Sequence, residues 1–184
     1  AYVSGKSVEE MEKAAEAFYN SASPYNPSYY WLDVEEKTMS DMNKGVEAFR
    51  AKLESLGAKN IGIYIGVYFM EEHSISTDKF SAIWIPSYGL DSGYFESSPN
   101  TDLDFDLHQY TSKGKLVGFE HYLDLNLISL SKDKEERIIE QYLAGESSIR
   151  TIAKTERIST STIYKVLERN DVANNRKKVS QNSC

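Results

Sequence analysis

Apolar residues alternate between helical and strand-like patterns along the first 130 residues. Residues 7–21 and 38–57 carry apolar side chains at helical spacing. Ser7 and Ser40 are the expected N-caps of these helices, and Gly57 is the expected C-terminal stop of the second. Strands are expected at residues 29–35, 61–69, 82–88 and 105–111, which are rich in β-branched and aromatic side chains. This alternation of helices and strands favours an α/β fold with mostly parallel strands.

The pattern changes after residue 130. Short helical segments follow at residues 132–145, 147–156 and 159–170. Their close spacing is typical of a helix-turn-helix. We therefore expect two domains, residues 1–130 and a three-helix module at residues 131–170. Residues 171–184 are polar and are expected to form a disordered tail.

Charge is distributed unevenly between these parts. The chain of 184 residues has a formal net charge of −7. Residues 1–130 hold 10 basic and 20 acidic residues, whereas residues 131–184 hold 11 and 8. An acidic first part and a mildly basic second part predict different binding partners for the two.

Membrane, metal and cofactor sites are not expected. No apolar run reaches the roughly 20 residues that span a bilayer, and no signal peptide is visible. Three scattered His residues and the single Cys184 offer no metal-ligand spacing and exclude a disulfide framework. We therefore expect a protein without metal, cofactor or membrane insertion.

Two acidic residues stand close together in the first expected strand. Side chains two residues apart point to the same side of a strand, so Trp31, Asp33 and Glu35 share one face. With a rise of ~3.3 Å per residue, the Cβ atoms of the two acids lie about 6–7 Å apart, which suits paired carboxylates that cut a glycosidic bond. The alternative is a strand end at which both acids reach water. The pair alone does not decide between these interpretations.

Tyrosine is frequent, with 13 residues in the chain. In residues 61–69, one expected face carries Ile, Val and Phe, and the other carries Gly62, Tyr64, Gly66 and Tyr68. Such a mixed face suits the inside of a barrel that opens on a cleft, where tyrosines stack on sugars and bind their hydroxyl groups. A packed core that uses tyrosine as filler is the alternative.

Four blocks of sequence, in a fixed order, extend this interpretation. They are WLDVE at residues 31–35, IGIYIGVYF at 61–69, IWIPSYG at 83–89 and DLHQYTSKGKLVGFEHYLDLN at 106–126. Together they resemble family 25 glycoside hydrolases, many of them bacteriophage endolysins, over roughly residues 1–130. The resemblance implies an irregular, TIM-like β/α barrel. It also implies a muramidase, which cleaves the β-1,4 bond between N-acetylmuramic acid and N-acetylglucosamine in peptidoglycan.

The resemblance also implies roles for individual residues. Glu35 corresponds to the general acid/base. Asp33 corresponds to its partner carboxylate, which orients the substrate acetamido group or balances positive charge at the sugar. Asp124, in LDLN, matches a further active-site acid. The positions that match the sugar cleft or its surroundings are Tyr64, Trp84, Tyr88, Gln109 and Tyr110.

Two features depart from the family pattern. The family's first catalytic Asp lies on the first barrel strand, and residues 1–6 do not resemble that segment. We therefore expect a barrel without its opening strands and without that acid. His108 stands where the family usually has Trp before Gln-Tyr, and we interpret it as a tolerated replacement rather than a new hydrogen-bonding residue.

The second part has a resemblance of its own. Residues 145–167 resemble the helix-turn-helix of resolvases and transposase-like proteins. Its expected partners, through residues 131–170, are anionic wall polymers or nucleic acid, and a small appendage with neither role is the third alternative. The main interpretation is a phage-type enzyme, held in the host cytoplasm until release onto the cell wall. A competing interpretation is a DNA-binding regulator whose acidic first domain senses or dimerises.

Overall fold

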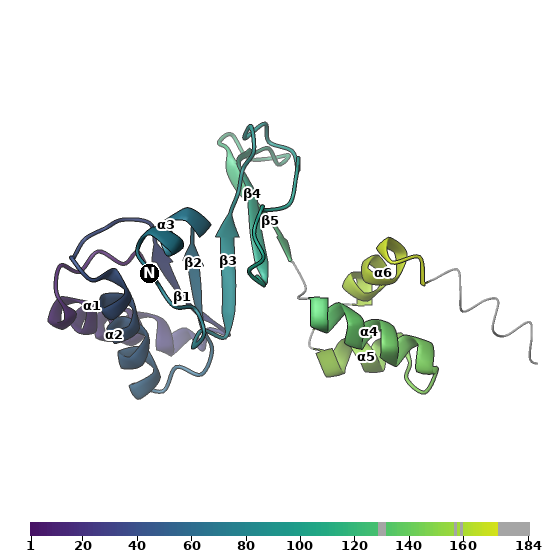
Figure 1. The fold of residues 1–184 in the computed structure, drawn as a ribbon, viewed down its shortest axis with the longest axis horizontal. Coiled ribbons are helices and arrows are strands. Elements are labelled where there is room, and N and C mark those ends of the chain that lie inside the picture. Colours follow the sequence, from purple (N-terminus) through teal and green to yellow (C-terminus); the bar gives the residue numbers. More distant parts are fainter. Residues whose placement is uncertain (129–131, 157, 159, 173–184) are drawn as a thin grey trace, which may run out of the picture. The chain divides into compact units, whose positions relative to one another are not determined.

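The computed structural model describes residues 1–128, 132–156, 158 and 160–172. The chain forms two compact units, Ala1–Ser129 and Leu130–Cys184. The first is a mixed α/β unit, and the described part of the second consists of three α-helices and their connections (Figure 1).

A five-stranded sheet forms the centre of the first unit. In chain order and in sheet order, its strands are β1 (Tyr30–Val34), β2 (Ile61–Ile65), β3 (Ala82–Pro86), β4 (Leu107–Gly114) and β5 (Leu123–Ile128). β1 to β4 pair in parallel, and β5 pairs antiparallel with β4 as a hairpin. The predicted α/β class with mostly parallel strands is confirmed.

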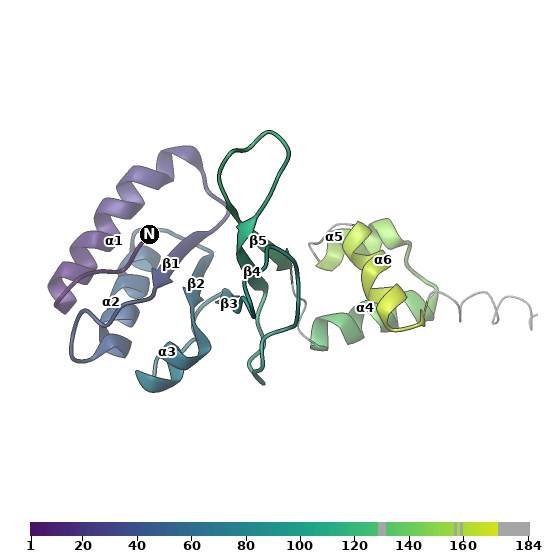
Figure 2. The same cartoon turned by 90° about the horizontal axis from the view of Figure 1, so that it is seen from above.

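Two helices, α1 (Val8–Ala22) and α2 (Met42–Ser55), lie side by side next to the sheet (Figures 1 and 2). The Oγ of Ser7 accepts a hydrogen bond from the Glu10 amide at 3.2 Å, which confirms the predicted cap of α1. For α2 the predicted cap was wrong. Asp41, rather than Ser40, accepts a bond from the Lys44 amide at 2.9 Å. A carboxylate there also interacts favourably with the positive end of the helix dipole.

These two helices and the first two strands share one apolar core. Its large, fully buried side chains include Met11, Leu32, Phe49, Leu53, Ile63 and Ile65. Burying each such side chain contributes about 1.5–3 kcal/mol. On β1, Tyr30, Leu32 and Val34 are buried, so Trp31 and Asp33 point to the opposite face. The core therefore fixes which way the acidic strand faces.

The second strand ends earlier than the sequence pattern predicts. Pairing with β1 stops at Val34 and Ile65, and helix α3 (Val67–Glu72) follows at once. The carbonyl oxygen of Gly66 accepts a hydrogen bond from the Met70 amide at 2.9 Å. The prediction of a strand through residue 69 was wrong, because β-propensity yields to the helical hydrogen bonds that the backbone forms once its strand partner ends.

The fifth strand was not predicted, although Leu123, Leu125 and Leu127 alternate with the polar residues Asp124 and Asn126, as in a strand. β5 forms by pairing with β4. β4 itself extends three residues beyond its predicted end at residue 111. Two register shifts along β4 disturb its alternation. A pattern of period two does not reveal such a bulged partner.

The second unit consists of α4 (Lys132–Ala144), α5 (Ile149–Glu156) and α6 (Thr160–Arg169). Its core includes Ile138, Ile152, Ile163 and Leu167, all fully or almost fully buried. Val172 also belongs to this core, although the sequence suggested a disordered tail from residue 171. The remaining tail, residues 173–184, lies outside the described residues.

The close contact between β1 and β2 predicts the effect of one substitution. Gly62 pairs with Trp31, and a Cβ added at Gly62 would lie 2.5 Å from the indole ring. We expect Gly62→Ala to lower the free energy of unfolding by about 1–3 kcal/mol, because the indole has to move. Urea denaturation followed by tryptophan fluorescence measures this in the first unit, which holds both tryptophans, Trp31 and Trp84.

Gly66→Ala is the matched control, because an added Cβ there meets no atom within 4 Å and the backbone φ is −71°. Its effect should stay below about 1 kcal/mol. Equal losses for the two variants would contradict the packing argument.

Candidate active site

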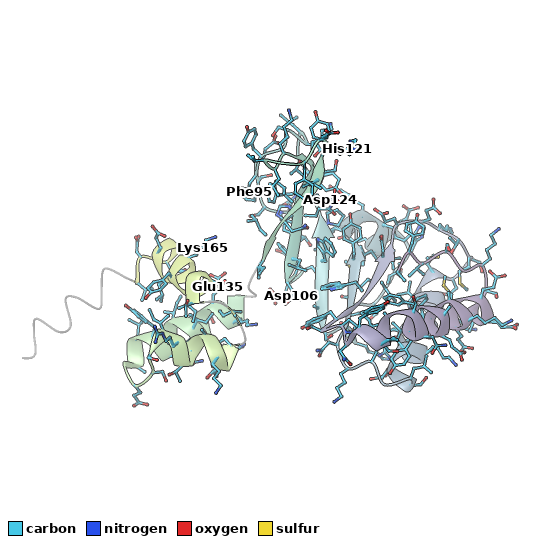
Figure 3. All side chains as sticks on the ribbon, turned by 180° about the vertical axis from the view of Figure 1, so that it is seen from behind. Phe95, Asp106, His121, Asp124, Glu135 and Lys165 are labelled. Carbon is cyan, nitrogen blue, oxygen red and sulfur yellow. The ribbon has the colours of Figure 1, made fainter. Side chains whose placement is uncertain are left out.

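A cavity of about 380 Å³ opens at the carboxyl ends of the parallel strands. It is lined by Ala1, Trp31, Asp33, Glu35, Tyr64, Trp84, Tyr88, Gln109 and Asp124. In folds built from parallel strands, this edge of the sheet is where ligands bind, because the loops that follow the strands meet there. Asp124 reaches the same edge from the start of β5 (Figure 3).

Strand register brings the wall of the cavity together. Asp33 on β1 pairs with Tyr64 on β2, and Tyr64 pairs with Trp84 on β3. The three residues therefore form a row across three adjacent strands. Glu35 follows one residue after the end of β1. The predicted shared face of Trp31, Asp33 and Glu35 is confirmed, because all three line the cavity.

Seven of the eight predicted site residues line this cavity; Tyr110 does not. The Tyr110 ring instead contacts Phe95 and His108, with ring centroids 5.9 and 6.4 Å apart. A role for Tyr110 at the sugar cleft stays a prediction from the resemblance.

The interpretation of His108 was wrong. Its ring is buried, and its Nε2 lies 2.8 Å from the carbonyl oxygen of Ser87, so the ring N–H donates a hydrogen bond. His108 thereby ties β4 to the chain that follows β3. It is a hydrogen-bonding residue rather than a neutral replacement.

The aromatic side chains form one connected group. The ring of Trp84 meets Trp31 and Tyr64 edge to face, at centroid distances of 5.6 and 5.0 Å. The hydroxyl oxygens of Tyr64 and Tyr88 are 3.2 Å apart, within hydrogen-bonding distance. Edge-to-face pairs contribute about 0.5–1.5 kcal/mol each beyond their buried area. The wall is therefore a preformed surface of rings and hydroxyl groups.

Asn126 holds this wall in place and was not predicted. The indole N–H of Trp84 donates a hydrogen bond to Asn126 Oδ1 at 2.9 Å. Asn126 stands two residues after Asp124, on the same strand. Side chains at this spacing share a face, so the LDLN motif contained a usable signal. Trp31 was likewise placed on the correct face but was not named as a site residue.

Asp33 is held in the cavity by backbone hydrogen bonds to the first residues of the chain. Its backbone amide donates to the Ala1 carbonyl at 2.8 Å, and its carbonyl accepts from the Val3 amide at 2.9 Å. Burial raises the pKa of its side chain, and the nearby amino group of Ala1 partly offsets that rise. Within the described structure, Asp33 Oδ1 is buried without a hydrogen-bond partner. Such an atom is set to accept a hydrogen bond from a ligand.

Glu35 is suited to carry a proton. Burial raises the pKa of its carboxyl group, and the negative charges of Asp33, Glu36 and Asp124 raise it further. A carboxylic acid in such surroundings stays protonated to a higher pH than an isolated one, as a general acid requires. Burial also raises the pKa of the Tyr64 hydroxyl, which therefore stays a neutral hydrogen-bond donor.

The described residues contain no group of three or more His, Cys, Asp or Glu side chains arranged to hold a metal ion. None of the helices in the described part of the chain is long and apolar enough to cross a membrane.

Several solved structures have a similar fold. A glycosyl hydrolase 25 of Streptococcus pneumoniae, described as a virulence factor participating in host cell invasion, is 78% identical with a TM-score of 0.69, over 70% of this chain and 57% of that one. The catalytic domain of endolysin ply40 from a Listeria monocytogenes bacteriophage is 24% identical with a TM-score of 0.61, over 70% and 65%. The spore cortex lytic enzyme SleM of Clostridium perfringens is 22% identical with a TM-score of 0.56, over 72% and 50%.

The last two likenesses show the fold alone. The chain spans about half to two thirds of the length of these solved proteins. Comparison with curated proteins gives no significant match. The family model described as glycosyl hydrolases family 25 matches residues 2–119, which is well over half of the chain. The chain therefore belongs to glycosyl hydrolase family 25.

Proposed function

We propose that the first unit is the catalytic part of a muramidase that cleaves the β-1,4 bond between N-acetylmuramic acid and N-acetylglucosamine in peptidoglycan. The observation that carries this proposal is one cavity that gathers Asp33, Glu35 and Asp124 beside an aromatic wall. Paired carboxylates supply the acid and the charge that glycoside hydrolysis needs. Membership of family 25 supports the same chemistry. We further propose that the open sheet is part of the family's irregular β/α barrel.

Glu35 is the general acid/base of this proposal. Its raised pKa keeps a proton available for the leaving oxygen of the glycosidic bond. Once it has given up that proton, the carboxylate takes one from the water that completes the reaction. The neighbouring charges of Asp33 and Asp124 stabilise the positive charge that develops on the sugar.

Asp33 and the aromatic wall hold the substrate. The unpartnered Oδ1 of Asp33 accepts a hydrogen bond from the N–H of an acetamido group, which both sugars of peptidoglycan carry. The rings of Trp31 and Trp84 provide apolar surface against a sugar face. Tyr88 and Gln109 supply hydrogen bonds to its hydroxyl groups.

The place of action follows from the substrate. A muramidase acts on the bacterial cell wall, where peptidoglycan lies. Storage in the host cytoplasm before lysis stays a prediction from the resemblance to bacteriophage endolysins.

The full-length protein with Glu35→Gln tests the assignment. We expect the release of reducing sugar ends from purified Gram-positive walls to fall by about 10²–10⁴-fold, because the amide cannot transfer the proton. Glu72→Gln is the matched control: this exposed residue of α3 does not line the cavity and is not among the charges that raise the pKa of Glu35, so we expect activity within about threefold of the wild type. Activity that survives Glu35→Gln, or equal losses in both variants, would refute the assignment.

The raised pKa values of the same carboxylates predict that their neutral substitutions stabilise the folded protein in a pH-dependent way. The pKa values of Asp33 and Glu35 are raised in the folded protein. The folded state then binds these protons more tightly than the unfolded chain, so stability is lost as pH rises through the raised pKa values. We expect Asp33→Asn and Glu35→Gln to raise the Tm at pH 7, with a gain that shrinks towards pH 4.

Tryptophan fluorescence during heating measures that Tm in the first unit, because both tryptophans lie in it. Glu72→Gln again serves as the control and should show a smaller change in Tm at pH 7. A lower Tm at pH 7 for both cavity variants would show that the carboxylates hold the fold together rather than strain it.

A second candidate function concerns residues 132–172. We propose that these helices form a helix-turn-helix-like module that binds an anionic wall polymer through α6. The supporting observation is the exposed surface of α6, on which the side chains of Tyr164 and Lys165 are exposed. Figure 3 shows Lys165 on this helix. Residues 132–172 hold equal numbers of basic and acidic residues, which is a weak electrostatic basis for duplex DNA. A wall ligand would also bring both units to one substrate and raise the overall affinity.

Two opposite charge changes on α6 test this module. Lys165→Gln should weaken the binding of the full-length protein to teichoic-acid-bearing walls by about two- to fivefold, and Glu168→Gln should strengthen it by a similar factor. Co-sedimentation with walls, before and after chemical removal of teichoic acid, measures the effect. Salt-dependent binding to duplex DNA without wall binding would instead support a nucleic-acid partner.

A further inference from the structure

A second cavity lies on the β4–β5 hairpin, next to the catalytic one. It measures about 210 Å³ and is lined by Ser92, Gly93, Tyr94, Lys113, Lys115 and Tyr122. Tyr122 stands two residues before Asp124, which lines the catalytic cavity. Figure 3 shows Asp124 on the hairpin, with His121 farther towards its tip. Because Tyr122 and Asp124 are two residues apart, their Cα atoms lie at most about 7 Å from each other.

The positive charge of this region is concentrated in the second cavity. Residues 80–128 contain seven acidic residues, and their only Lys or Arg residues are Lys113 and Lys115. Both lysines line the cavity. An otherwise acidic segment thus presents its whole positive charge at one place, which is the arrangement that attracts an anionic group.

Lys113 forms an ion pair with Asp91, whereas Lys115 can contact an anionic ligand. The Nζ of Lys113 lies 3.5 Å from Asp91. Hydrogen bonds from Thr111 and Ser112 lower the pKa of Asp91 to about 2, so it stays ionised beside Lys113. The Nζ of Lys115 lies 5.6 Å from the centre of the Tyr122 ring. Among the described residues no carboxylate forms an ion pair with Lys115.

A glycine permits the close packing that closes this cavity. Gly93 adopts a φ of +92°, which other residues rarely adopt. A Cβ at this position would lie 2.8 Å from the carbonyl oxygen of Lys113. The loop that carries Tyr94 therefore approaches β4 more closely than a side chain would allow. The cavity is formed by two segments held together, rather than by a chance depression in one loop.

We propose that this second cavity binds a carboxylate of the peptide stem of peptidoglycan, with Lys115 as the contacting cation. This inference rests on the proposed muramidase function. The stem is attached to N-acetylmuramic acid, one of the two sugars at the scissile bond, and its acidic residues carry carboxylates. Two extended residues, at roughly 3.5 Å each, cover the span from Asp124 in the lining of the first cavity to Tyr122 in that of the second. The exposed rings of Tyr94 and Tyr122 pack against the apolar parts of the peptide.

Binding to three synthetic disaccharides tests the proposal without requiring hydrolysis. The first is N-acetylglucosaminyl-N-acetylmuramic acid with an L-Ala-D-Glu stem, the second has the same stem with both Glu carboxyl groups amidated, and the third has no peptide. The full-length protein carrying Glu35→Gln is titrated, and the fluorescence of Trp31 and Trp84 in the catalytic cavity reports binding. We expect the acidic stem to bind about fivefold more tightly than the other two, a gain that salt weakens.

Adding a second substitution identifies the cation. Lys115→Met should abolish the preference for the acidic stem, Lys115→Arg should keep most of it, and Lys59→Met, on an exposed residue outside both cavities, should leave it unchanged. Equal affinity for the three disaccharides, no binding of any of them, or equal effects of Lys115→Met and Lys59→Met would overturn the inference.

Hydrolysis of walls by the wild type would support the muramidase proposal in each of those cases. Conversely, a wild type that cleaves no wall would overturn the muramidase proposal and, with it, the assignment of the ligand as a peptide stem, even where the acidic disaccharide binds more tightly.

Discussion

The parallel pairing of β1 with β2 is the interaction on which the candidate site depends. It sets Asp33 against Tyr64, and the next pair of strands sets Tyr64 against Trp84. A shift of one residue would turn every side chain of β1 to the other face and bury the acids in the core. The apolar residues of β1 prevent that shift, because Leu32 and Val34 are fully buried. The geometry of the carboxylates is thus specified by the residues that alternate with them.

The cavity of the candidate site contains features that lower the stability of the folded protein. Asp33 has a buried oxygen without a partner, and the charges around Glu35 raise its pKa. Each feature disfavours the ionised form of the carboxyl group concerned, and so lowers the stability of the folded protein near neutral pH. The fold tolerates this because the core formed by α1, α2 and the first strands lies on the opposite face of β1. Because the core and the candidate site lie on opposite faces of β1, one face stabilises the fold while the other carries the candidate site.

Local patterns predicted the first helix, the α/β class and the shared face of Trp31, Asp33 and Glu35, because burial and capping leave a periodic signal. The end of β2 at Ile65 was not predictable, since Val67 and its neighbours favour strands and only the loss of a pairing partner releases them into a helix. Matching family motifs located Asp124, which no periodicity would have connected with Glu35. Asn126 was missed because its partner, the Trp84 indole, is distant in the sequence.

The irregular register of the hairpin explains how one element contributes to two cavities. In a regular strand, Gln109, Thr111 and Lys113 would share a face. The register of β4 shifts between Gln109 and Thr111 and again between Thr111 and Gly114, and bulges of this kind bend and twist a strand. Gln109 consequently lines the cavity of the candidate active site, while Lys113 lines the other. Asp124 lies on β5 and Tyr122 directly precedes this strand, so a change in the hairpin alters both cavities together. A substrate that carries its peptide next to its scissile bond is the kind of ligand for which such coupled cavities are useful.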